Sequence, residues 1–313
     1  MAIGFAFSVD QSLIDSGSVR FQENKVGFSI SARGHVTNLK LFSVFALPNE
    51  SLFVSCASCD EGTGIRVAAD DNVPALTAVG WRWIAPSQPG IHDLIVTADY
   101  SADTMCLRIF VLHPFSEVKN GTLNGYRIGQ YPKKPYKGLP QYNPPRGFVE
   151  VTEENADILL TPHFRLRQFL CKQDGEYPKY VVLRSLLLLK LEYILEKVNQ
   201  AGYRCDTFGI LSGYRTPWYN KAIGNVKYSR HQWGGAVDFY IDENPVDSMM
   251  DDLNRDGKIN WKDAALLYDI VDDMYGTEPY ERFIGGLGRY RKTEKHGPFV
   301  HVDVRGFRAR WGD

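Results

Sequence analysis

The sequence lacks the features that mark nucleic-acid-binding, membrane-spanning or newly exported proteins. Lys and Arg number 36 against 37 Asp and Glu, a formal net charge of −1, so no overall basic field favours binding to nucleic acid. No apolar run reaches the ~18 residues that a membrane-spanning helix needs. Residues 1–17 lack the basic region of a signal peptide, so we expect either a cytosolic protein or one whose export signal has been removed.

Cysteine is scarce as well: the chain has five, an odd number. Cys56 and Cys59 have the spacing of a redox pair or of half a zinc site, but no second pair completes a zinc set. We therefore expect either a local disulfide or two unreactive thiols there. Cysteine usage leaves the cellular compartment open.

What the sequence does contain favours two folded domains, because 313 residues with 44% hydrophobic content can bury sizeable cores. Residues 1–115 carry short alternating runs separated by turn residues, which predicts an all-β, immunoglobulin-like sandwich. Residues 116–147 are rich in Pro, Gly and Tyr and predict a linker, an extended arm or a packed connector. Residues 148–313 form the second predicted domain.

Helix signals recur in this second domain. Thr161 and Pro162 have the types expected at a helix cap and first helical position. A leucine-rich apolar stripe predicts a longer helix from about Pro178 to Gln200, and Pro217 begins another.

The strongest chemical signal joins His231 and Asp238 to His301. We expect Asp238 on an apolar, β-rich run with His231 in the loop that enters it. Alternation in the run FVHVDVR places His301, Asp303 and Arg305 on one face of a second strand. Two imidazoles and one carboxylate, with a fourth position left for water, are the ligands of a catalytic zinc site. The alternative is a hydrogen-bonded cluster in the core.

Neighbouring residues would complete a hydrolase site. His296, five residues before His301, is the candidate general acid or base, or stabiliser of the oxyanion, with Glu294 as its rival. Arg215 would clamp a substrate carboxylate or the developing oxyanion. Tyr214 is a further candidate for contact with the substrate. Asp303 and Ser229 are candidates to orient the metal ligands through hydrogen bonds from outside the metal site.

A second metal signal lies between Asp238 and His301. Residues 252–263 follow the spacing of a calcium loop, with Gly257 at its sixth position, and a helix pattern comes next. The last position is Asp rather than the usual Glu, which resembles the calcium loops of dockerins. The predicted Ca²⁺ ligands are Asp252, Asn254, Asp256, Lys258, Asn260 and Asp263. The alternative is an acidic, solvated turn.

Three motifs together resemble the zinc peptidases of the D-alanyl-D-alanine carboxypeptidase family: SGYRTP, SxHxxGxAxD and FVHVDVRG, within about residues 148–313. The resemblance implies an α+β catalytic domain, an antiparallel sheet flanked by helices. It also implies zinc on His231, Asp238 and His301, with functional roles for Arg215 and His296. Many members carry Glu three residues before the last His, where this chain has Pro298.

The resemblance implies a zinc metallopeptidase that hydrolyses peptide bonds of peptidoglycan stem peptides or cross-links, as a D,D- or L,D-carboxypeptidase or endopeptidase. We expect a periplasmic or extracellular protein, because mature peptidoglycan lies there. The alternatives are a non-catalytic peptidoglycan-binding or adhesion protein with a degenerate zinc site, and a peptidase or phage-type lysin with another substrate. The sequence indicates no oligomeric state.

Overall fold

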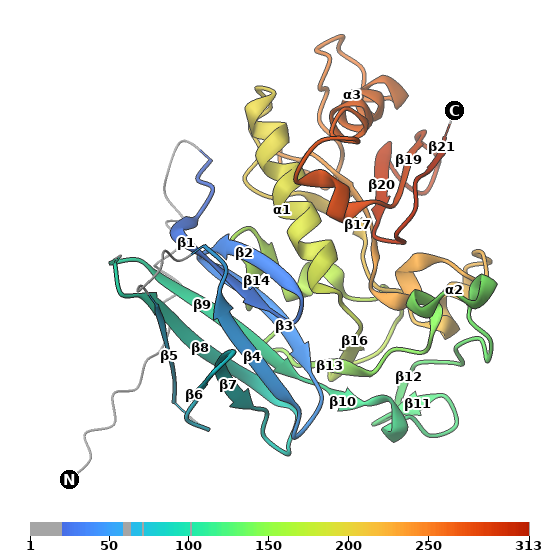
Figure 1. Cartoon of the computed structure of the whole chain (residues 1–313). Coiled ribbons are helices and arrows are strands. Elements are labelled where there is room, and N and C mark those ends of the chain that lie inside the picture. Colours follow the sequence, from blue (N-terminus) through green and yellow to red (C-terminus); the bar gives the residue numbers. More distant parts are fainter. Residues whose placement is uncertain (1–20, 59–63, 71, 101, 313) are drawn as a thin grey trace. The chain divides into compact units, whose positions relative to one another are not determined.

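The computed structural model of the chain describes residues 21–58, 64–70, 72–100 and 102–312 (Figure 1). Its backbone contacts divide the chain into two compact units. The first unit comprises Met1–Pro114 and Leu159–Pro162, and the second comprises Phe115–Ile158 and His163–Asp313. In the part of the chain that the structure describes, no helix is both long and apolar enough to cross a membrane.

The first unit is built from strands in two sheets. One sheet has the order β2-β1-β4-β7-β6 and the other the order β3-β9-β8-β5. The first sheet comprises β1 (Lys25–Ala32), β2 (His35–Leu39), β4 (Ser51–Cys56), β6 (Ala75–Thr77) and β7 (Gly80–Ile84). The second comprises β3 (Leu41–Ala46), β5 (Ile65–Ala69), β8 (Gly90–Ala98) and β9 (Thr104–Val111), and the short strands β10 (His113–Pro114) and β14 (Leu159–Thr161) also belong to this unit.

The core of the first unit follows from strand alternation. Along β1, Val26, Phe28 and Ile30 are buried while their neighbours are partly or fully exposed, as expected for a strand with one face against a core.

Cys56 is disulfide-bonded, and Cys59, the other half of the expected local pair, lies outside the described residues. Three further cysteines are free and buried: Cys106, Cys171 and Cys205.

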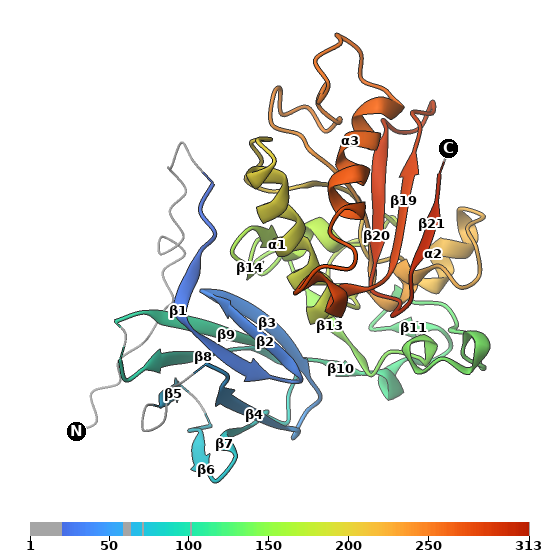
Figure 2. The same ribbon diagram turned by 45° about the horizontal axis from the view of Figure 1, so that its top comes forward.

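The second unit is organised around a five-stranded sheet with the order β17-β18-β20-β19-β21. Its strands are β17 (Gly209–Ser212), β18 (Ala236–Tyr240), β19 (Gly286–Tyr290), β20 (Phe299–Asp303) and β21 (Ala309–Trp311). Around it lie β11 (Thr122–Leu123), β12 (Tyr126–Arg127), β13 (Gly147–Val151), β15 (Phe164–Arg165) and β16 (Lys179–Val181). The helices are α1 (Ser185–Gln200), α2 (Pro217–Ala222) and α3 (Trp261–Asp272), and α3 packs on β19 and β20 (Figure 2).

The predicted fold class is wrong. The structure is 34% strand and 19% helix, its strands are divided among several small sheets, and only three α-helices occur in the described residues. The described residues form no clear α+β catalytic domain with helices flanking an antiparallel sheet. One pair of the central sheet, β19 with β21, is in fact parallel.

One helix prediction failed, and a second placed the start of a helix too early, for a common reason. The residues after Thr161 form the short strand β15 and a 3-10 turn, and α1 begins only at Ser185. The residues before it, Lys179–Val181, pair with β13 instead. Short apolar segments fit a strand as well as a helix, and pairing with a distant strand decides between them. The helices predicted after Pro217 and after the 252–263 loop are α2 and α3.

Residues 116–147 pack as part of the second unit. The Tyr131 hydroxyl donates a hydrogen bond to Gln232 O at 2.8 Å, and the Gln141 side chain donates one to Arg305 O at 2.7 Å. Trp233 Nε1 donates to Asn143 O at 2.9 Å. The bonds to Gln232 and from Trp233 hold the Tyr-rich segment against the turn that carries His231, and the bond to Arg305 joins it to the residues after β20.

Candidate metal centre

Antiparallel pairing brings Asp238 and His301 together. In the register of β18 and β20, Asp238 lies directly opposite His301. Side chains opposite each other on one face of a sheet are about 5 Å apart at Cβ, so the two groups meet. Alternation along β20 turns Val300 and Val302 to the other face, where both are buried.

His231 comes from a 3-10 turn, Arg230–Trp233, that precedes β18. Gly234 ends this turn with a left-handed backbone, φ +58°. A Cβ at Gly234 would lie 2.1 Å from Val182 O, so both the conformation and the space require glycine. The glycine of the SxHxxGxAxD motif therefore sets the direction of the chain between His231 and Asp238.

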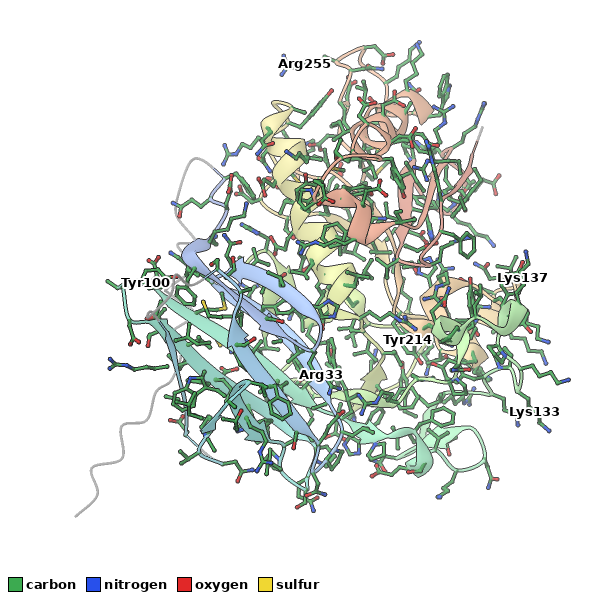
Figure 3. All side chains as sticks on the ribbon, viewed as in Figure 1. Arg33, Tyr100, Lys133, Lys137, Tyr214 and Arg255 are labelled. Atoms are coloured by element: carbon green, nitrogen blue, oxygen red, sulfur yellow. The ribbon has the colours of Figure 1, made fainter. Side chains whose placement is uncertain are left out.

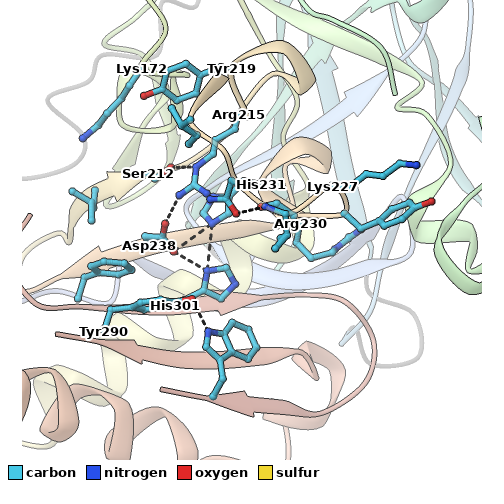
Figure 4. A pocket seen from close by; sticks show the side chains of 18 of the residues that line it. Lys172, Ser212, Arg215, Tyr219, Lys227, Arg230, His231, Asp238, Tyr290 and His301 are labelled. Atoms are coloured by element: carbon cyan, nitrogen blue, oxygen red, sulfur yellow. Dashed lines mark hydrogen bonds and ion pairs between the residues drawn. The ribbon is translucent and has the colours of Figure 1, made fainter. Parts of the chain in front are cut away.

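The three predicted ligands converge on one point (Figure 4). His301 Nδ1 lies 2.7 Å from Asp238 Oδ1, and His231 Nε2 lies 3.3 Å from the same oxygen. The two ring nitrogens are 3.3 Å apart. All three side chains are buried, and theirs is the one group of at least three such ligands found among the described residues that could hold a metal ion.

The far side of each imidazole is occupied. His231 Nδ1 lies 2.7 Å from Gly213 O, a partner that can only accept, so this nitrogen carries the proton and Nε2 is free. His301 Nε2 lies 3.3 Å from Asp303 Oδ2, while Nδ1, the nitrogen on the side of the candidate metal position, lies 2.7 Å from Asp238 Oδ1. Asp303 is fixed in turn by Gly286 N at 2.8 Å and by Arg305. Hydrogen bonds of this kind orient histidine ligands in metal sites.

The electrostatics of the group favour an ionised carboxylate. Burial alone would raise the pKa of Asp238, but His231 and His301 hold it well below its ordinary value. Burial lowers the pKa of His231, partly offset by Asp238. For His301, burial acts to lower the pKa, but its hydrogen bonds to Asp238 and Asp303 outweigh that effect and raise it. One anionic carboxylate oxygen and two imidazole nitrogens are together ligands that suit a divalent cation.

The ligands line a cleft of about 950 Å³. Arg215 is in its wall, with Nη2 2.6 Å from Asp238 Oδ2 and Nε 2.8 Å from Ser212 Oγ. His296 lines the cleft too, and its Nδ1 lies 2.8 Å from Gly297 O. The predicted rival base, Glu294, is exposed and is not among the lining residues.

The other two predicted residues are placed differently from each other. Ser229 lines the cleft, immediately before the turn that carries His231. Tyr214, labelled in Figure 3, is only 1% exposed, and its hydroxyl lies 3.0 Å from the Tyr131 hydroxyl. Tyr214 is absent from the cleft lining, so its place supports packing beneath the Arg215 turn rather than contact with substrate.

Trp311 was missed in the sequence. Its ring centroid lies 5.1 Å from that of His301, and its Nε1 donates to the Tyr290 hydroxyl at 2.6 Å. A Cβ at Gly286 or Gly288 would come within 2.6 Å of the indole, so two glycines of β19 make room for it. The Gly-Leu-Gly pattern of β19 could have indicated that a large side chain packs there. Only the parallel pairing of β21 with β19 shows that this side chain is Trp311.

The predicted calcium loop folds around its own backbone. Asp252 accepts from Gly257 N at 2.7 Å, and Asp263, fully buried, accepts from Leu253 N at 2.9 Å and Asn260 N at 2.8 Å. The loop is exposed where Figure 3 labels Arg255. Its carboxylates do not form a metal-ligand group of the kind found at His231, so Ca²⁺ binding there stays a prediction.

Comparison with protein-family models, with curated proteins and with solved structures finds no match to this chain. What the structure shows is a buried His-Asp-His group that could hold a metal ion and that lines a cleft.

Proposed function

We propose that this protein is a zinc-dependent peptidase that cleaves peptide bonds of peptidoglycan stem peptides or cross-links outside the cytoplasm. The observation that supports it most is the convergence of His231 Nε2, Asp238 Oδ1 and His301 Nδ1, with the far nitrogen of each ring already hydrogen-bonded. Two histidines and one carboxylate are typical of catalytic zinc sites, which keep a position open for water or substrate.

Each nearby residue has a role that its contacts allow. A bound zinc ion would polarise the scissile carbonyl and favour attack by water near neutral pH. His296 directs Nδ1 at Gly297 O, which leaves Nε2 to accept or return a proton. Arg215 uses Nε and Nη2 on Ser212 and Asp238, so among the described residues its Nη1 is left for a substrate oxygen.

The choice of peptidoglycan rests on the three motifs that resemble the D-alanyl-D-alanine carboxypeptidase family. It is supported by a cleft of about 950 Å³ in which an arginine lies beside the candidate metal ligands. The chemistry of a zinc peptidase and the identity of its substrate are separate claims, and the experiment below tests them separately.

One observation favours a second candidate, a peptidoglycan-binding protein without activity. Pro298 occupies the position of the glutamate that many family members carry, and Glu294 does not line the cleft. If His296 cannot act in place of that glutamate, the site would hold metal and ligand without turnover.

We also propose that residues 252–263 bind Ca²⁺. Support comes from the ligand spacing and from Gly257 at the sixth position, whose φ of +78° gives the sharp turn that a calcium loop needs. The ion would brace the segment that leads into α3.

The deciding experiment measures metal content by mass spectrometry and then the products released from purified sacculi. Zinc near one per chain, with new peptide fragments, supports the enzyme, and the fragment masses identify the bond. Asp238→Asn, nearly the same size, should lose both zinc and products, whereas the exposed Lys221→Gln, outside the cleft, should retain both. Zinc without products would favour the binding protein, and a chain that takes up no zinc would contradict the proposal.

A further inference from the structure

The residues that line the cleft carry more positive than negative charge, unlike the chain as a whole. Among the described residues that line it, only Asp238 is acidic, and that carboxylate is paired with Arg215. Six lining residues are cationic: Lys172, Arg215, Lys227, Arg230, Lys295 and Arg305. The full sequence has a net charge of −1, so the cleft has a local excess of positive charge that the chain as a whole lacks.

Two of these six cations are already neutralised within the protein, Arg215 by Asp238 and Arg305 by Asp303. Within the described part of the chain, Lys172, Lys227 and Lys295 have no ion pair, and all three are exposed. Burial and the charge of Arg215 lower the pKa of Lys172. A neighbouring positive charge disfavours the protonated form of a lysine, so the effect of Arg215 is the one expected where several cations lie close together.

Arg230 differs from the lysines because it is buried, with 2% of its surface exposed. Its Nη1 donates to Gln141 O at 2.8 Å, and its Nε and Nη2 have no hydrogen-bond partner among the described residues. Arg184 donates to the same Gln141 carbonyl at 2.8 Å. Burial and the charge of Arg230 lower the pKa of Arg184 to about 10. A buried guanidinium without a carboxylate is costly, and such groups are commonly retained for a ligand.

The packing around Arg230 holds its guanidinium in place. The Tyr142 ring centroid lies 4.5 Å from the Arg230 Cζ and that of Trp233 lies 5.8 Å from it. A Cβ at Gly235 would lie 2.9 Å from Nη2, so glycine is needed beside it. The unpartnered Nε and Nη2 have no exposed surface, so Arg230 contributes its positive charge to the wall of the cleft rather than a hydrogen-bond donor to a ligand.

We propose that the cleft selects anionic peptides, and that the charges of Lys172, Lys227, Lys295 and Arg230 attract a substrate carboxylate other than the group near Arg215. The inference rests on the proposed peptidase function and names its substrate class. In peptidoglycan the glutamyl residue of the stem peptide carries such a carboxylate when it is not amidated. The protein would therefore distinguish free-acid stem peptides from their amidated forms.

The test compares two synthetic peptides, Ala-γ-D-Glu-Lys-D-Ala-D-Ala with a free glutamyl carboxyl and the same peptide with that carboxyl amidated. Binding is measured by calorimetry on chelator-treated full-length protein, and cleavage by mass spectrometry on the zinc-loaded protein. We expect the free acid to bind at least about tenfold tighter, the range of a charge-assisted hydrogen bond. The preference should shrink on raising NaCl from about 0.05 M to about 0.5 M.

Lys172→Gln, Lys227→Gln and Lys295→Gln change exposed side chains, so folding should be preserved, and Arg230→Gln tests the buried group. At least one of the four should reduce the preference for the free acid severalfold, while Lys221→Gln, an exposed lysine of α2 outside the cleft, should not. A circular dichroism melt checks that each variant is folded.

The outcomes separate this inference from the proposed function. Cleavage of both peptides with equal affinities would overturn carboxylate selection and leave the peptidase in place. Tighter binding of the free acid without cleavage would support selection and contradict the peptidase. A preference that survives all four substitutions, or no measurable binding of either peptide, would overturn the inference.

Discussion

Arg215 Nη2 lies 2.6 Å from Asp238 Oδ2, while the other oxygen of the same carboxylate, Oδ1, faces the two histidines. The arginine therefore holds the oxygen that does not point at the candidate metal position. Both side chains are largely buried, so the pair is shielded from water. Arg215 and a bound metal ion would both balance the negative charge of the Asp238 carboxylate.

This sharing gives a prediction for Arg215→Met. Without metal, the variant leaves a buried carboxylate without its cation, and we expect it to lose about 3 kcal/mol of unfolding free energy. A bound zinc ion would replace the missing charge, so zinc should stabilise the variant more than the wild type. Thermal melts with and without zinc measure this difference. Cleavage should fall, because Nη1 is lost with the side chain. A smaller zinc stabilisation than in the wild type would mean that orientation of Asp238 matters more than its charge.

Asp303 supports the second imidazole from behind, 3.3 Å from His301 Nε2. In Asp303→Asn the residue keeps its size but loses the charge that holds this ring and Arg305. We expect zinc affinity to fall by about 10–100-fold, the usual effect of removing such a partner. Competition with a coloured chelator measures the affinity. An unchanged affinity in a variant that melts normally would show that His301 needs no support from Asp303.

Gly288 should tolerate no side chain. An added Cβ would lie 2.3 Å from Trp311 Nε1 and would displace the indole from His301 and Tyr290. We expect Gly288→Ala to lower the free energy of unfolding by about 1–3 kcal/mol in denaturant titrations. Gly297→Ala is the matched control, because its Cβ would meet nothing nearer than Met249 Cε at 4.0 Å. Equal losses in both variants would mean that Trp311 can move at little cost.

The sequence was sufficient to predict that His231, Asp238 and His301 lie together, but not to predict the residues that surround them. Alternation in FVHVDVR placed His301 and Asp303 on one face, and the 3.3 Å contact between them agrees. The spacing of His231 and Asp238 likewise joined two groups that the structure brings together. Local patterns succeed here because each motif is a single turn or strand.

The cationic cleft could not be predicted in this way. Lys172, Lys227 and Lys295 come from three distant segments, and only the tertiary fold places them around one opening. The failed helix after Thr161 has a similar origin, because pairing with other strands outweighed a local cap signal. Tyr214 shows the limit within a motif, since it is next to Arg215 in sequence but faces the core.

Lys190 should make stability depend on pH. This lysine of α1 is fully buried, and its Nζ donates to Asp303 O at 2.9 Å and Phe283 O at 3.0 Å. Burial lowers its pKa to about 7 in the folded protein. The unfolded chain, with the ordinary lysine pKa, then binds more protons above pH 7, so stability rises with pH. The contribution is about 2 kcal/mol between about pH 7 and pH 9.

The measurement is the unfolding free energy of the wild type and of Lys190→Met across that pH range. We expect the stability of the wild type relative to the variant to increase with pH by the amount above, because only the wild type has the buried amine. A difference that stays constant would mean that Lys190 remains protonated in the fold, held by its two carbonyl partners and the nearby Tyr280 ring.

Calcium should stabilise the protein through residues 252–263, separately from zinc. Without the ion, Asp252 and Asp256 bring negative charge to one exposed loop. We expect Ca²⁺ at about 100 times its dissociation constant to add about 2.7 kcal/mol to the unfolding free energy of the zinc-loaded protein. Asp256→Asn should lose most of this gain, whereas Asp269→Asn, an exposed acid of α3 outside the loop, should retain it. Zinc content should be the same in all three proteins, because the loop contributes none of the three ligands of the buried group. Equal melting temperatures with and without Ca²⁺ in the wild type would identify the loop as a solvated turn whose carboxylates serve only its own backbone amides.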